Sequence, residues 1–433
     1  MDVNKLYETL LVDRKVFLTG QAGTGKTTLV NELKKKFRNP VSLGTTGVAA
    51  VLVGGETVHS FFKLGISNTM EELTAWDKNR MTQTKKDYYA LLGWTSFLLR
   101  ECDVIIIDEV SMMSSQLMEM ILFRLESLGF SHIPILFVGD LLQLPPVKNE
   151  TNTIIDHPRW KEWTIVYLTK IWRTSDNTFI EILNKIRRGE PDKQVNEFFY
   201  NNPKEQIKPR GDTIKNFTIL TSINAKVNEI NKSFLDANPQ KLYKFDAEIN
   251  ITGQYATQKQ VDEWLDFHAK VKKHLHLKVG SKVMTIMNVK PIDTDEDYVN
   301  GDTGVIMEIN ETDNVIWMKR DRDGKEIPIQ KKEFAKSKYT KVNGELILEP
   351  EWTINQYPII LAYAITIHKS QGLSLPKVMI DARQIFAPSQ FYVAVSRGTN
   401  PEGVYQLGYD PKVILNVNKR MVRFYEGLSE GAN

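Results

Sequence analysis

The sequence predicts an α/β protein with two parallel-sheet domains, and three features of the 433-residue chain support this. Short apolar runs rich in Val and Ile alternate with longer helical segments, which is the pattern of βαβ units. The apolar run at 16–18 leads directly into a glycine-rich turn. The run at 104–107 is continuously apolar and ends in two carboxylates, as expected of a strand that a parallel sheet buries on both faces.

The first domain is expected to span 1–168. We expect its strands at 16–19, 41–44, 104–108, 133–139 and 165–168, and a helix at 117–128. Between 67 and 89 the pattern gives way to a polar and charged stretch. This stretch predicts a small subdomain inserted on the surface.

The second domain is expected to comprise 169–240 and 352–433, interrupted by a β-rich insertion at 241–351. Its expected elements are strands at 217–220, 378–381 and 404–407 and helices at 225–236 and 389–397. The insertion carries short β-rich runs at 283–287, 303–309 and 315–318. The dipeptides Asn300-Gly301, Asp323-Gly324 and Asn343-Gly344 are hairpin signals, and a small barrel-like fold fits them best.

The composition is typical of a globular protein, with 42% hydrophobic and 25% charged residues and a net charge of +3. This charge permits nucleic-acid binding without requiring it. The apolar runs are too short for a membrane span, and the first 15 residues lack the apolar segment of a secretory signal. We therefore expect a cytoplasmic protein without a membrane partner. The single cysteine, Cys102, is expected to be a small core residue.

The segment Gly20 to Thr28 fits the pattern G-x-x-x-x-G-K-[ST] of a phosphate-binding loop. Its glycines would let backbone N–H groups turn towards a phosphate, and the following helix would present its positive end to the same anion. Lys26 would reach the β- and γ-phosphates, and Thr27 would bind Mg²⁺. The alternative is a glycine-rich turn with a structural role alone.

The adjacent acids Asp108 and Glu109 strengthen the prediction of nucleotide hydrolysis. At the end of a buried strand, Asp108 can hold Mg²⁺ and Glu109 can polarise a water in line with the γ-phosphate. The alternative is that the two acids cap a helix that begins at Ser111.

Further segments carry candidate polar residues. The hydroxyl groups at 45–46 and the segment 57–62 could contact nucleic-acid phosphates, but the residues taken alone favour a helix cap and an aromatic core pair at Phe61 and Phe62. Gln143, in the segment 139–146, follows a buried strand and could sense the γ-phosphate. The segments 364–372 and 392–397 are the last of these candidate segments.

In kind, order and spacing these six motifs resemble those of superfamily one DNA helicases, most closely the petite integration frequency (PIF) family and the RecD-type helicases. The residues at 107–112 and 139–146 are the most family-specific part of this resemblance. The resemblance implies two RecA-like domains, a wedge subdomain at 67–89 and an SH3-like insertion at 241–351. It implies catalytic roles for Glu109, Gln143, Arg173 and Arg397, with both arginines acting as fingers. It implies nucleotide contacts from Gly23, Thr24, Gly25, Lys26, Thr27, Thr28, Gln371 and Gly372, and Mg²⁺ ligands at Thr27 and Asp108. It implies DNA contacts from Thr45, Thr46, Gly47, His59, Ser60, Phe61, Thr366, His368 and Ser370.

The implied activity is that of an ATP-dependent helicase, with ATP and Mg²⁺ as cofactors, that moves 5′ to 3′ on single-stranded DNA. Forked and G-quadruplex DNA are the implied substrates, in replication, repair or telomere maintenance, and we expect a monomer. Aromatic residues such as Phe61, Phe62 and Trp76 could stack on bases. A DNA-stimulated clamp or remodeller, an RNA helicase and an idle DNA-binding subunit remain alternatives.

The sequence departs from the family pattern in two places. A Gln in the usual adenine-reading context is absent before the phosphate loop, where 7–12 is short and apolar, so selectivity for adenine is open. The segment between 112 and 133 lacks the Pro-Phe-Gly-Gly wording of eukaryotic members. This favours a bacterial or viral relative, and for a bacterial protein a place at the nucleoid.

Overall fold

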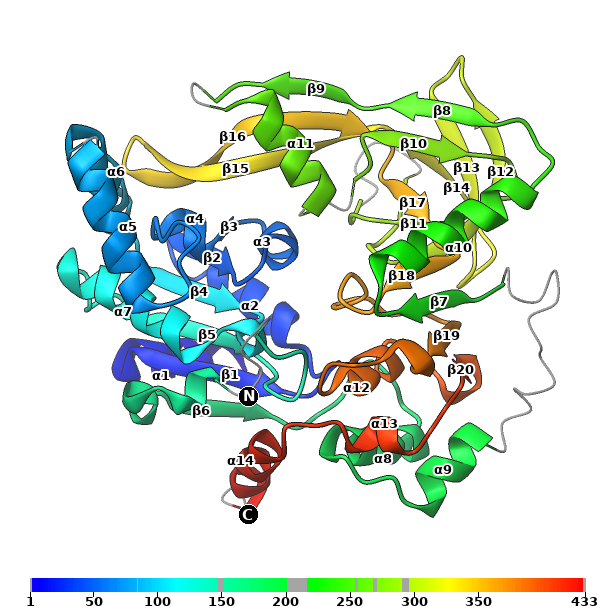
Figure 1. Ribbon diagram of the computed structural model, residues 1–433, viewed down its shortest axis with the longest axis horizontal. Helices are drawn as coiled ribbons and strands as arrows, with labels where there is room; N and C mark the ends of the chain where they lie inside the picture. Colours follow the sequence, from blue (N-terminus) through cyan, green and yellow to red (C-terminus); the bar gives the residue numbers. More distant parts are fainter. Residues whose placement is uncertain are drawn as a thin grey trace. The chain divides into compact units, whose positions relative to one another are not determined.

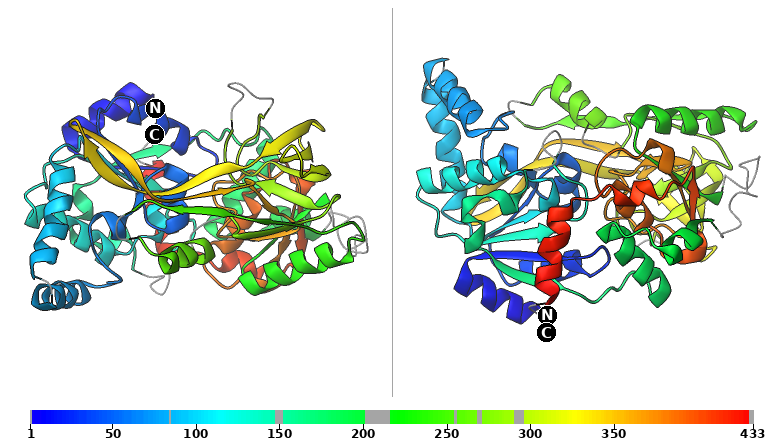
Figure 2. Two further views of the ribbon diagram at one scale, coloured as in Figure 1. Left: turned by 90° about the horizontal axis from the view of Figure 1, so that it is seen from above. Right: turned by 60° about the horizontal axis from the view of Figure 1, so that its bottom comes forward.

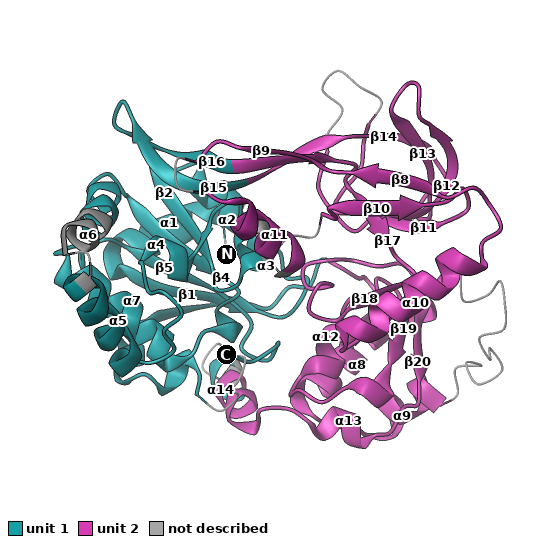
Figure 3. Cartoon of the chain, turned by 45° about the horizontal axis from the view of Figure 1, so that its top comes forward, with its two compact units in different colours: residues 1–172, 336–351, 426–433 teal, residues 173–335, 352–425 magenta. Residues whose placement is uncertain are grey.

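The computed structural model describes residues 2–83, 85–146, 152–200, 216–253, 256–267, 271–289 and 296–430. The chain divides into two compact units (Figure 3). Unit 1 comprises 1–172, 336–351 and 426–433, and unit 2 comprises 173–335 and 352–425. Among the described helices, none combines the length and the apolar composition that a membrane crossing requires.

Unit 1 is built on a parallel sheet of six strands in the order β3-β2-β4-β5-β1-β6 (Figure 1). The strands are β1 Lys15–Gly20, β2 Pro40–Gly44, β3 Glu56–Thr57, β4 Val104–Asp108, β5 Ile135–Gly139 and β6 Thr164–Leu168. The central strands β1, β4 and β5 are almost entirely buried, because Val, Ile, Leu and Phe side chains fill both faces. All five predicted strands are therefore confirmed, with β5 beginning after Pro134.

The helices of unit 1 are α1 Val3–Asp13, α2 Lys26–Lys34, α3 Gly47–Val53, α4 Val58–Phe61, α5 Met70–Gln83, α6 Lys85–Leu99 and α7 Ser115–Ser127. The alternative that a helix begins at Ser111 is wrong. Residues Val110–Met112 form a single 3₁₀ turn, and α7 begins later because the Ser114 hydroxyl caps it by accepting from Leu117 N at 3.1 Å.

The polar stretch predicted as an insertion lies in α5 and the start of α6, which pack against each other. Arg124 of α7 ties α5 to the rest of unit 1. Its guanidinium donates to both carboxylate oxygens of Asp77 at 2.6 and 2.7 Å, and its Nε donates to the carbonyl of Phe62 at 3.2 Å. Because this bidentate pair is buried, breaking it would leave a charge without compensation.

Unit 2 contains a second parallel sheet, of four strands in the order β18-β7-β19-β20. Its strands are β7 Thr218–Thr221, β18 Ala364–Thr366, β19 Val378–Asp381 and β20 Val404–Leu407. The helices of unit 2 are α8 Asn177–Arg188, α9 Lys193–Tyr200, α10 Asn224–Ala237, α11 Gln258–Phe267 within the insertion, α12 Gln390–Val395, α13 Lys412–Leu415 and α14 Lys419–Glu430, whose last residues belong to unit 1. The predicted strands and the predicted helices at 225–236 and 389–397 are confirmed to within a few residues.

The insertion is antiparallel. A five-stranded sheet runs β14-β13-β12-β11-β17, β10 pairs with β8, and a three-stranded sheet runs β15-β16-β9. The strands are β8 Tyr243–Asp246, β9 Glu248–Ile251, β10 His274–Leu277, β11 Lys282–Thr285, β12 Thr303–Asn310, β13 Val315–Arg320, β14 Glu326–Gln330, β15 Lys332–Val342, β16 Glu345–Gln356 and β17 Ile359–Leu361. The β15–β16 hairpin forms a long twisted ribbon (Figure 2).

Two of the three predicted hairpin turns are confirmed, because each connects two described strands. Asp323-Gly324 connects β13 to β14 and Asn343-Gly344 connects β15 to β16. Asn343 and Gly344 both have positive φ, at 52° and 85°, as a tight hairpin turn requires. Asn300-Gly301 lies immediately before β12, but 290–295 is outside the described residues.

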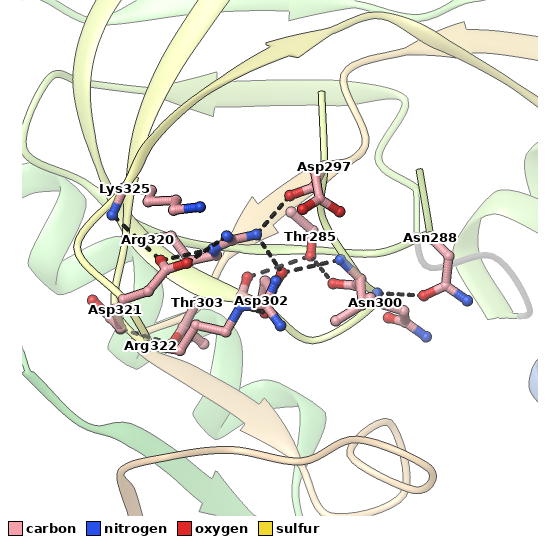
Figure 4. A network of polar contacts seen from close by, with 12 residues as sticks. Thr285, Asn288, Asp297, Asn300, Asp302, Thr303, Arg320, Asp321, Arg322 and Lys325 are labelled. Carbon is pink, nitrogen blue, oxygen red and sulfur yellow. Dashed lines mark hydrogen bonds and ion pairs between the residues drawn. The ribbon is translucent and has the colours of Figure 1, made fainter. Parts of the chain in front are cut away.

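A buried network of charges closes one end of the five-stranded sheet (Figure 4). The guanidinium of Arg320 donates to Asp323 at 2.6 and 3.0 Å, to Asp302 at 3.4 Å and to the carbonyl of Asp297 at 2.6 Å. Arg320 is only 2% exposed, so its donors have exchanged water for these oxygens. The network links the end of β13 to the turn that follows it and to the segment before β12.

The compact units do not coincide with the predicted domain boundaries. The outer part of the β15–β16 hairpin, 336–351, groups with unit 1, although the prediction placed it in the insertion. The antiparallel strands also continue to Leu361, past the predicted end at 351.

Candidate nucleotide and nucleic-acid sites

The phosphate-loop motif occupies the turn between β1 and α2. Gly25 caps α2 in the left-handed region, with φ 83°, which a side chain would disfavour. A Cβ at Gly20 would lie 2.6 Å from the carbonyl of Leu168 on the neighbouring strand β6. Gly20 therefore lets the chain pass close to β6 as it leaves the sheet, and Gly25 lets α2 begin directly after the loop. The result is a helix N-terminus beside backbone N–H groups, which suits an anion.

Lys26 lies across the mouth of this loop. Its ammonium donates to the carbonyl of Gly20 at 2.7 Å and to that of Gln21 at 2.9 Å. The next residue, Thr27, is exposed on the first turn of α2, as is Thr28. The predicted phosphate contact and the predicted metal-ligand hydroxyl thus lie on adjacent residues at one helix end.

The acid pair lies at the end of β4, at the same edge of the sheet. The carboxylate of Asp108 accepts from the amide of Glu109 at 2.8 Å. Burial raises the pKa of Asp108, while this hydrogen bond and the ammonium groups of Lys26 and Lys34 act in the opposite direction. A cation bound beside Asp108 would favour its ionised form.

Glu109 has a left-handed backbone with φ 55°, an uncommon conformation for a residue with a side chain. Its carbonyl accepts from the Thr45 hydroxyl at 2.9 Å. Strain of this kind gathers at functional sites, because surrounding contacts must hold it in place. The strained turn therefore supports a functional role for Glu109.

Gln143 follows β5 in a tight turn. Its backbone amide donates to the carbonyl of Asp140 at 2.9 Å, and its side chain is buried. The sheet register pairs Thr19 with Gly139 and Gly44 with Asp108. The carboxyl ends of these strands meet at one edge, which therefore carries the phosphate loop, the acid pair and Gln143.

A cavity of about 600 Å³ opens beside the phosphate loop within unit 1. Its wall includes Thr28, Tyr167 and Trp172, and the amide of Trp172 donates to the carbonyl of Gly23 at 2.7 Å. The indole is 67% exposed, and the ammonium of Lys170 lies 3.7 Å from its centroid. Trp172 was not among the predicted site residues, although its position directly before Arg173 is a signal that could have identified it.

The DNA-contact candidates of unit 1 mostly have structural partners. The Thr46 hydroxyl accepts from Ala49 N at 3.2 Å, at the start of α3, where Gly47 is the first residue. The hydroxyl of Ser60, on α4, donates to Glu56 at 2.7 Å. Burial lowers the pKa of His59. The helix-cap interpretation is therefore confirmed for Thr46 and stands beside the DNA-contact hypothesis.

The expectation that Phe61 and Phe62 stack on bases is corrected. Both rings are at most 1% exposed and pack edge to face, 5.1 Å between centroids, and Phe61 also packs on Tyr339. The core pair is the arrangement in the structure, because α4 turns its apolar side into unit 1. Trp76 on α5 is half-buried, with Arg80 lying 5.0 Å from its centroid.

The two candidate arginine fingers meet within unit 2. Arg173 donates to the carbonyl of Ser396 at 2.9 Å and to the hydroxyl of Ser374 at 3.0 Å. Arg397 is 1% exposed and donates to the Ser396 hydroxyl at 2.9 Å, to Val393 O at 2.9 Å and to Ser370 O at 3.3 Å. Arg173 and Arg397, which are far apart in the sequence, therefore both donate to Ser396.

The segment after β18 carries the remaining candidates. Thr366 ends the strand and accepts from Lys369 N at 3.2 Å, and Ser370 is buried. Burial lowers the pKa of His368. The buried amide nitrogen of Gln371 has no hydrogen-bond partner among the described residues, and Gly372 has φ 76°. An amide donor without a partner is a group that a ligand can satisfy.

Metal binding fits the donor set at the phosphate-loop edge. Among the described residues, no group of three or more His, Cys, Asp or Glu side chains gathers into a metal centre. Mg²⁺ at nucleotide sites takes one or two protein oxygens and completes its shell with phosphates and water. The Thr27 hydroxyl and the Asp108 carboxylate are such a pair.

The chain matches the family model of the PIF1-like helicases over residues 8–197. It is 32% identical over 441 residues to the ATP-dependent DNA helicase Pif1 of Campylobacter jejuni, covering 97% of this chain and 96% of the relative. The structure of Bacteroides Pif1 with ADP-AlF4 covers 99% of this chain and 96% of its own, at 26% identity and a TM-score of 0.81. Bacteroides Pif1 with ADP-AlF3 and single-stranded DNA has the same coverage, 27% identity and a TM-score of 0.62. The similarity extends along nearly the whole chain, which therefore belongs to the Pif1 family of helicases.

Proposed function

We propose that this chain is an ATP-dependent DNA helicase that moves along single-stranded DNA and separates the strands of a duplex. The observation that carries the proposal is the single sheet edge in unit 1 where the phosphate loop, the acid pair and Gln143 end adjacent strands. The Campylobacter and Bacteroides relatives support it, since their names and complexes give ATP, its analogues and DNA as what they act on or bind.

ATP is proposed to bind with its phosphates at the loop 20–28 and its base in the cavity beside Trp172. Lys26 would balance the charge of the β- and γ-phosphates. Thr27 and Asp108 would hold Mg²⁺, which when bound neutralises phosphate charge. Glu109 would orient and polarise the attacking water, and Gln143 would respond to the γ-phosphate. Because a stacked ring reads no particular base edge, selectivity for adenine is expected to be modest.

Arg173 and Arg397 are proposed to stabilise the charge that develops on the phosphoryl group during its transfer. Each arginine brought to that group is worth about 10³ to 10⁵ in rate in related enzymes. Gln371 and Gly372 are proposed to contact the nucleotide. The open amide donor of Gln371 is the feature that supports this role.

Movement on DNA is proposed to follow from alternation between nucleotide states. The two parallel-sheet regions are proposed to be RecA-like domains and the antiparallel insertion an SH3-like domain, with α5 and α6 as a wedge at the fork. Opening a duplex costs about 1.4 kcal/mol per base-pair step, so repeated opening requires hydrolysis. The proposed direction is 5′ to 3′, with forked and G-quadruplex DNA as substrates, and with a monomer as the acting form.

Two alternatives lead to different results in one experiment. Duplexes with a 5′ tail, a 3′ tail or no tail are offered to the protein with ATP, with a non-hydrolysable analogue, and as RNA counterparts. The proposal expects unwinding only with ATP and only of the 5′-tailed DNA. ATP hydrolysis without strand separation would identify a clamp or remodeller, and equal unwinding of RNA would identify an RNA track.

A further inference from the structure

The segment that joins β2 to α3 is bonded to the backbone of the acid pair. The hydroxyl of Thr45, the first residue after β2, donates to the carbonyl of Glu109 at 2.9 Å. The backbone amide of Thr45 donates to the carbonyl of Asp108 at 3.4 Å. Thr45 is only 8% exposed, so both bonds are made inside unit 1. The pairing of β2 with β4 therefore continues past the end of β2 as far as the two acids.

The carbonyl of Glu109 accepts two hydrogen bonds of different kinds. One comes from Met112 N at 3.1 Å and belongs to the local 3₁₀ turn. The other comes from Thr45 and connects this turn to the end of a neighbouring strand. A residue with a side chain keeps a left-handed backbone, here with φ 55°, only where its surroundings hold it. The Thr45 hydroxyl is therefore one of the contacts that fix the backbone from which the Glu109 carboxylate projects.

Thr45 and Thr46 use their hydroxyl groups in opposite ways. A threonine hydroxyl carries one proton, and Thr45 gives its proton to Glu109. The Thr46 hydroxyl accepts from Ala49 N at 3.2 Å, and its own proton has no acceptor among the described residues. Thr46 and Gly47 are also partly exposed. A strand phosphate can therefore accept the proton of Thr46, whereas the proton of Thr45 is already in use.

Helix α3, which follows these two threonines, is held closely at both ends. A Cβ at Gly44 would lie 2.1 Å from the backbone nitrogen of Ala50, so α3 lies directly against the end of β2. At the other end of α3 the ammonium of Lys34, on α2, donates to the carbonyl of Val53 at 3.1 Å. Closely packed elements yield little and pass a displacement on to their neighbours. A contact at 46–47 is therefore felt at Thr45.

We propose that the Thr45 hydroxyl is the link through which a single strand at 46–47 stimulates ATP hydrolysis. The strand holds Thr46 and Gly47, Thr45 holds the carbonyl of Glu109, and the Glu109 carboxylate is kept where it can polarise the attacking water. Thr45 is a positioning residue, since its hydroxyl acts only through Glu109. The inference rests on the proposed function, because it assumes that Glu109 acts on water and that the strand contacts 46–47.

The test measures ATP turnover by the full chain with Mg²⁺, without DNA and with a saturating deoxythymidine oligonucleotide. Anisotropy over a series of KCl concentrations measures strand affinity. Thr45→Val removes the hydroxyl and keeps a branched side chain, and Thr45→Ser keeps the hydroxyl. The matched control is Thr285→Val in unit 2, where a buried threonine hydroxyl donates to the carbonyl of Val299 at 2.5 Å. Thermal unfolding of each variant checks its folding.

We expect Thr45→Val to lower the strand-stimulated kcat about tenfold, because a displaced catalytic group slows the reaction even when its substrate binds normally. Turnover without DNA should stay within about twofold of the wild type, since the bond from Met112 N still holds the local turn. The KM for ATP, the strand affinity and its salt dependence should be unchanged. Thr45→Ser and Thr285→Val should be stimulated like the wild type.

The proposal would be overturned by a wild-type ratio of stimulated to basal turnover in Thr45→Val. Equal losses with and without the strand would show that the hydroxyl supports the turn and transmits nothing. A weaker strand affinity, with the slope of log K against log[salt] lowered by about 0.7 and wild-type kcat at saturation, would make Thr45 a direct phosphate contact.

The proposed function would fail in a different way. A wild type whose ATP turnover does not rise with the strand would refute the proposed function itself. Glu109→Gln with wild-type turnover would refute the role of Glu109. Neither of these results involves a change at Thr45, so each is distinguishable from a failure of the link.

Discussion

The carboxylates of Asp108 in unit 1 and Asp323 in unit 2 are in opposite situations. Burial raises the pKa of Asp108, and the neighbouring ammonium groups offset this only in part. Hydrogen bonds from Arg320 lower the pKa of Asp323 to about 2. The charges around Arg320 are paired with other groups of the fold. The positive charge near Asp108, in contrast, is too small to offset the burial of its carboxylate. This difference is what separates a site that awaits a ligand from one that holds the fold.

The largest effect on the site at the phosphate loop is expected from Lys26→Ala. The ammonium is expected to balance phosphate charge during hydrolysis, so we expect DNA-stimulated phosphate release to fall at least about 10³-fold while strand binding is largely retained. Lys35→Ala is the control, since that exposed residue follows the same helix and pairs with Glu32 at 2.6 Å. Unchanged turnover in Lys26→Ala would refute the site.

A second large effect is expected from Arg397→Ala. Turnover should fall about 10³-fold while the KM for ATP changes little, because a finger acts on the transition state. Arg397 also bonds to Val393 O and Ser370 O, so thermal unfolding must be measured alongside. Arg383→Ala, at a partly exposed pair with Asp381, is the control in the same unit. Equal losses in ATP binding and turnover would argue against the finger role.

The sequence alone was sufficient for the parallel strands and the phosphate-loop motif, because these depend on local apolar runs and on glycines next to Lys26. It was insufficient wherever tertiary packing decides. The sequence left both a base contact and a core pair open for Phe61 and Phe62. The packing of the two rings on each other, and of Phe61 on Tyr339, selects the core. Trp172 was missed because its position beside the loop depends on its hydrogen bond to Gly23 O.

The hairpin tip shows the same limit for domain boundaries. Turn chemistry at Asn343-Gly344 predicts the hairpin, but nothing local says which unit its tip joins. The amide of Tyr339 donates to Glu56 at 2.6 Å, and its hydroxyl accepts from Ser42 N at 2.7 Å. Contacts across nearly three hundred residues of chain therefore assign the tip to unit 1, and no sequence window contains both sides of them.

On the structural side of the comparison, Arg320→Ala should cost about 3–5 kcal/mol of unfolding free energy. It removes the buried guanidinium that bonds to Asp302, Asp323 and the carbonyl of Asp297, and it leaves Asp302 with the partly exposed Arg322 as its cationic partner. ATP turnover per folded molecule should be retained. The control is Arg322→Ala, whose partly exposed guanidinium also lies near Asp302 and should cost about 0–1 kcal/mol. Denaturant unfolding measures both, and equal losses would show that the network is not the closed structure described above.

A smaller effect should come from Trp172→Ala, which sharpens the assignment of the cavity beside the loop. Aromatic contacts of this kind contribute about 0.5–1.5 kcal/mol, so the KM for ATP should rise several-fold with kcat nearly unchanged. Trp94→Ala, on α6, removes an equally large exposed ring away from the cavity. A KM that stays at the wild-type value would place the base elsewhere.

The smallest expected effect concerns Asp323 itself and appears only in acid. Hydrogen bonds from Arg320 lower its folded pKa to about 2, below its ordinary value of 3.8, so folding favours the ionised form. This stabilisation is complete above about pH 5 and is lost as the pH falls towards 2, because the unfolded chain then binds the proton more readily than the folded chain. We expect the Tm of the wild type to fall more steeply across that window than the Tm of Asp323→Asn. Asp313→Asn, on the turn between β12 and β13, should keep the wild-type slope. Parallel profiles for wild type and Asp323→Asn would mean that Arg320 does not hold this carboxylate in solution.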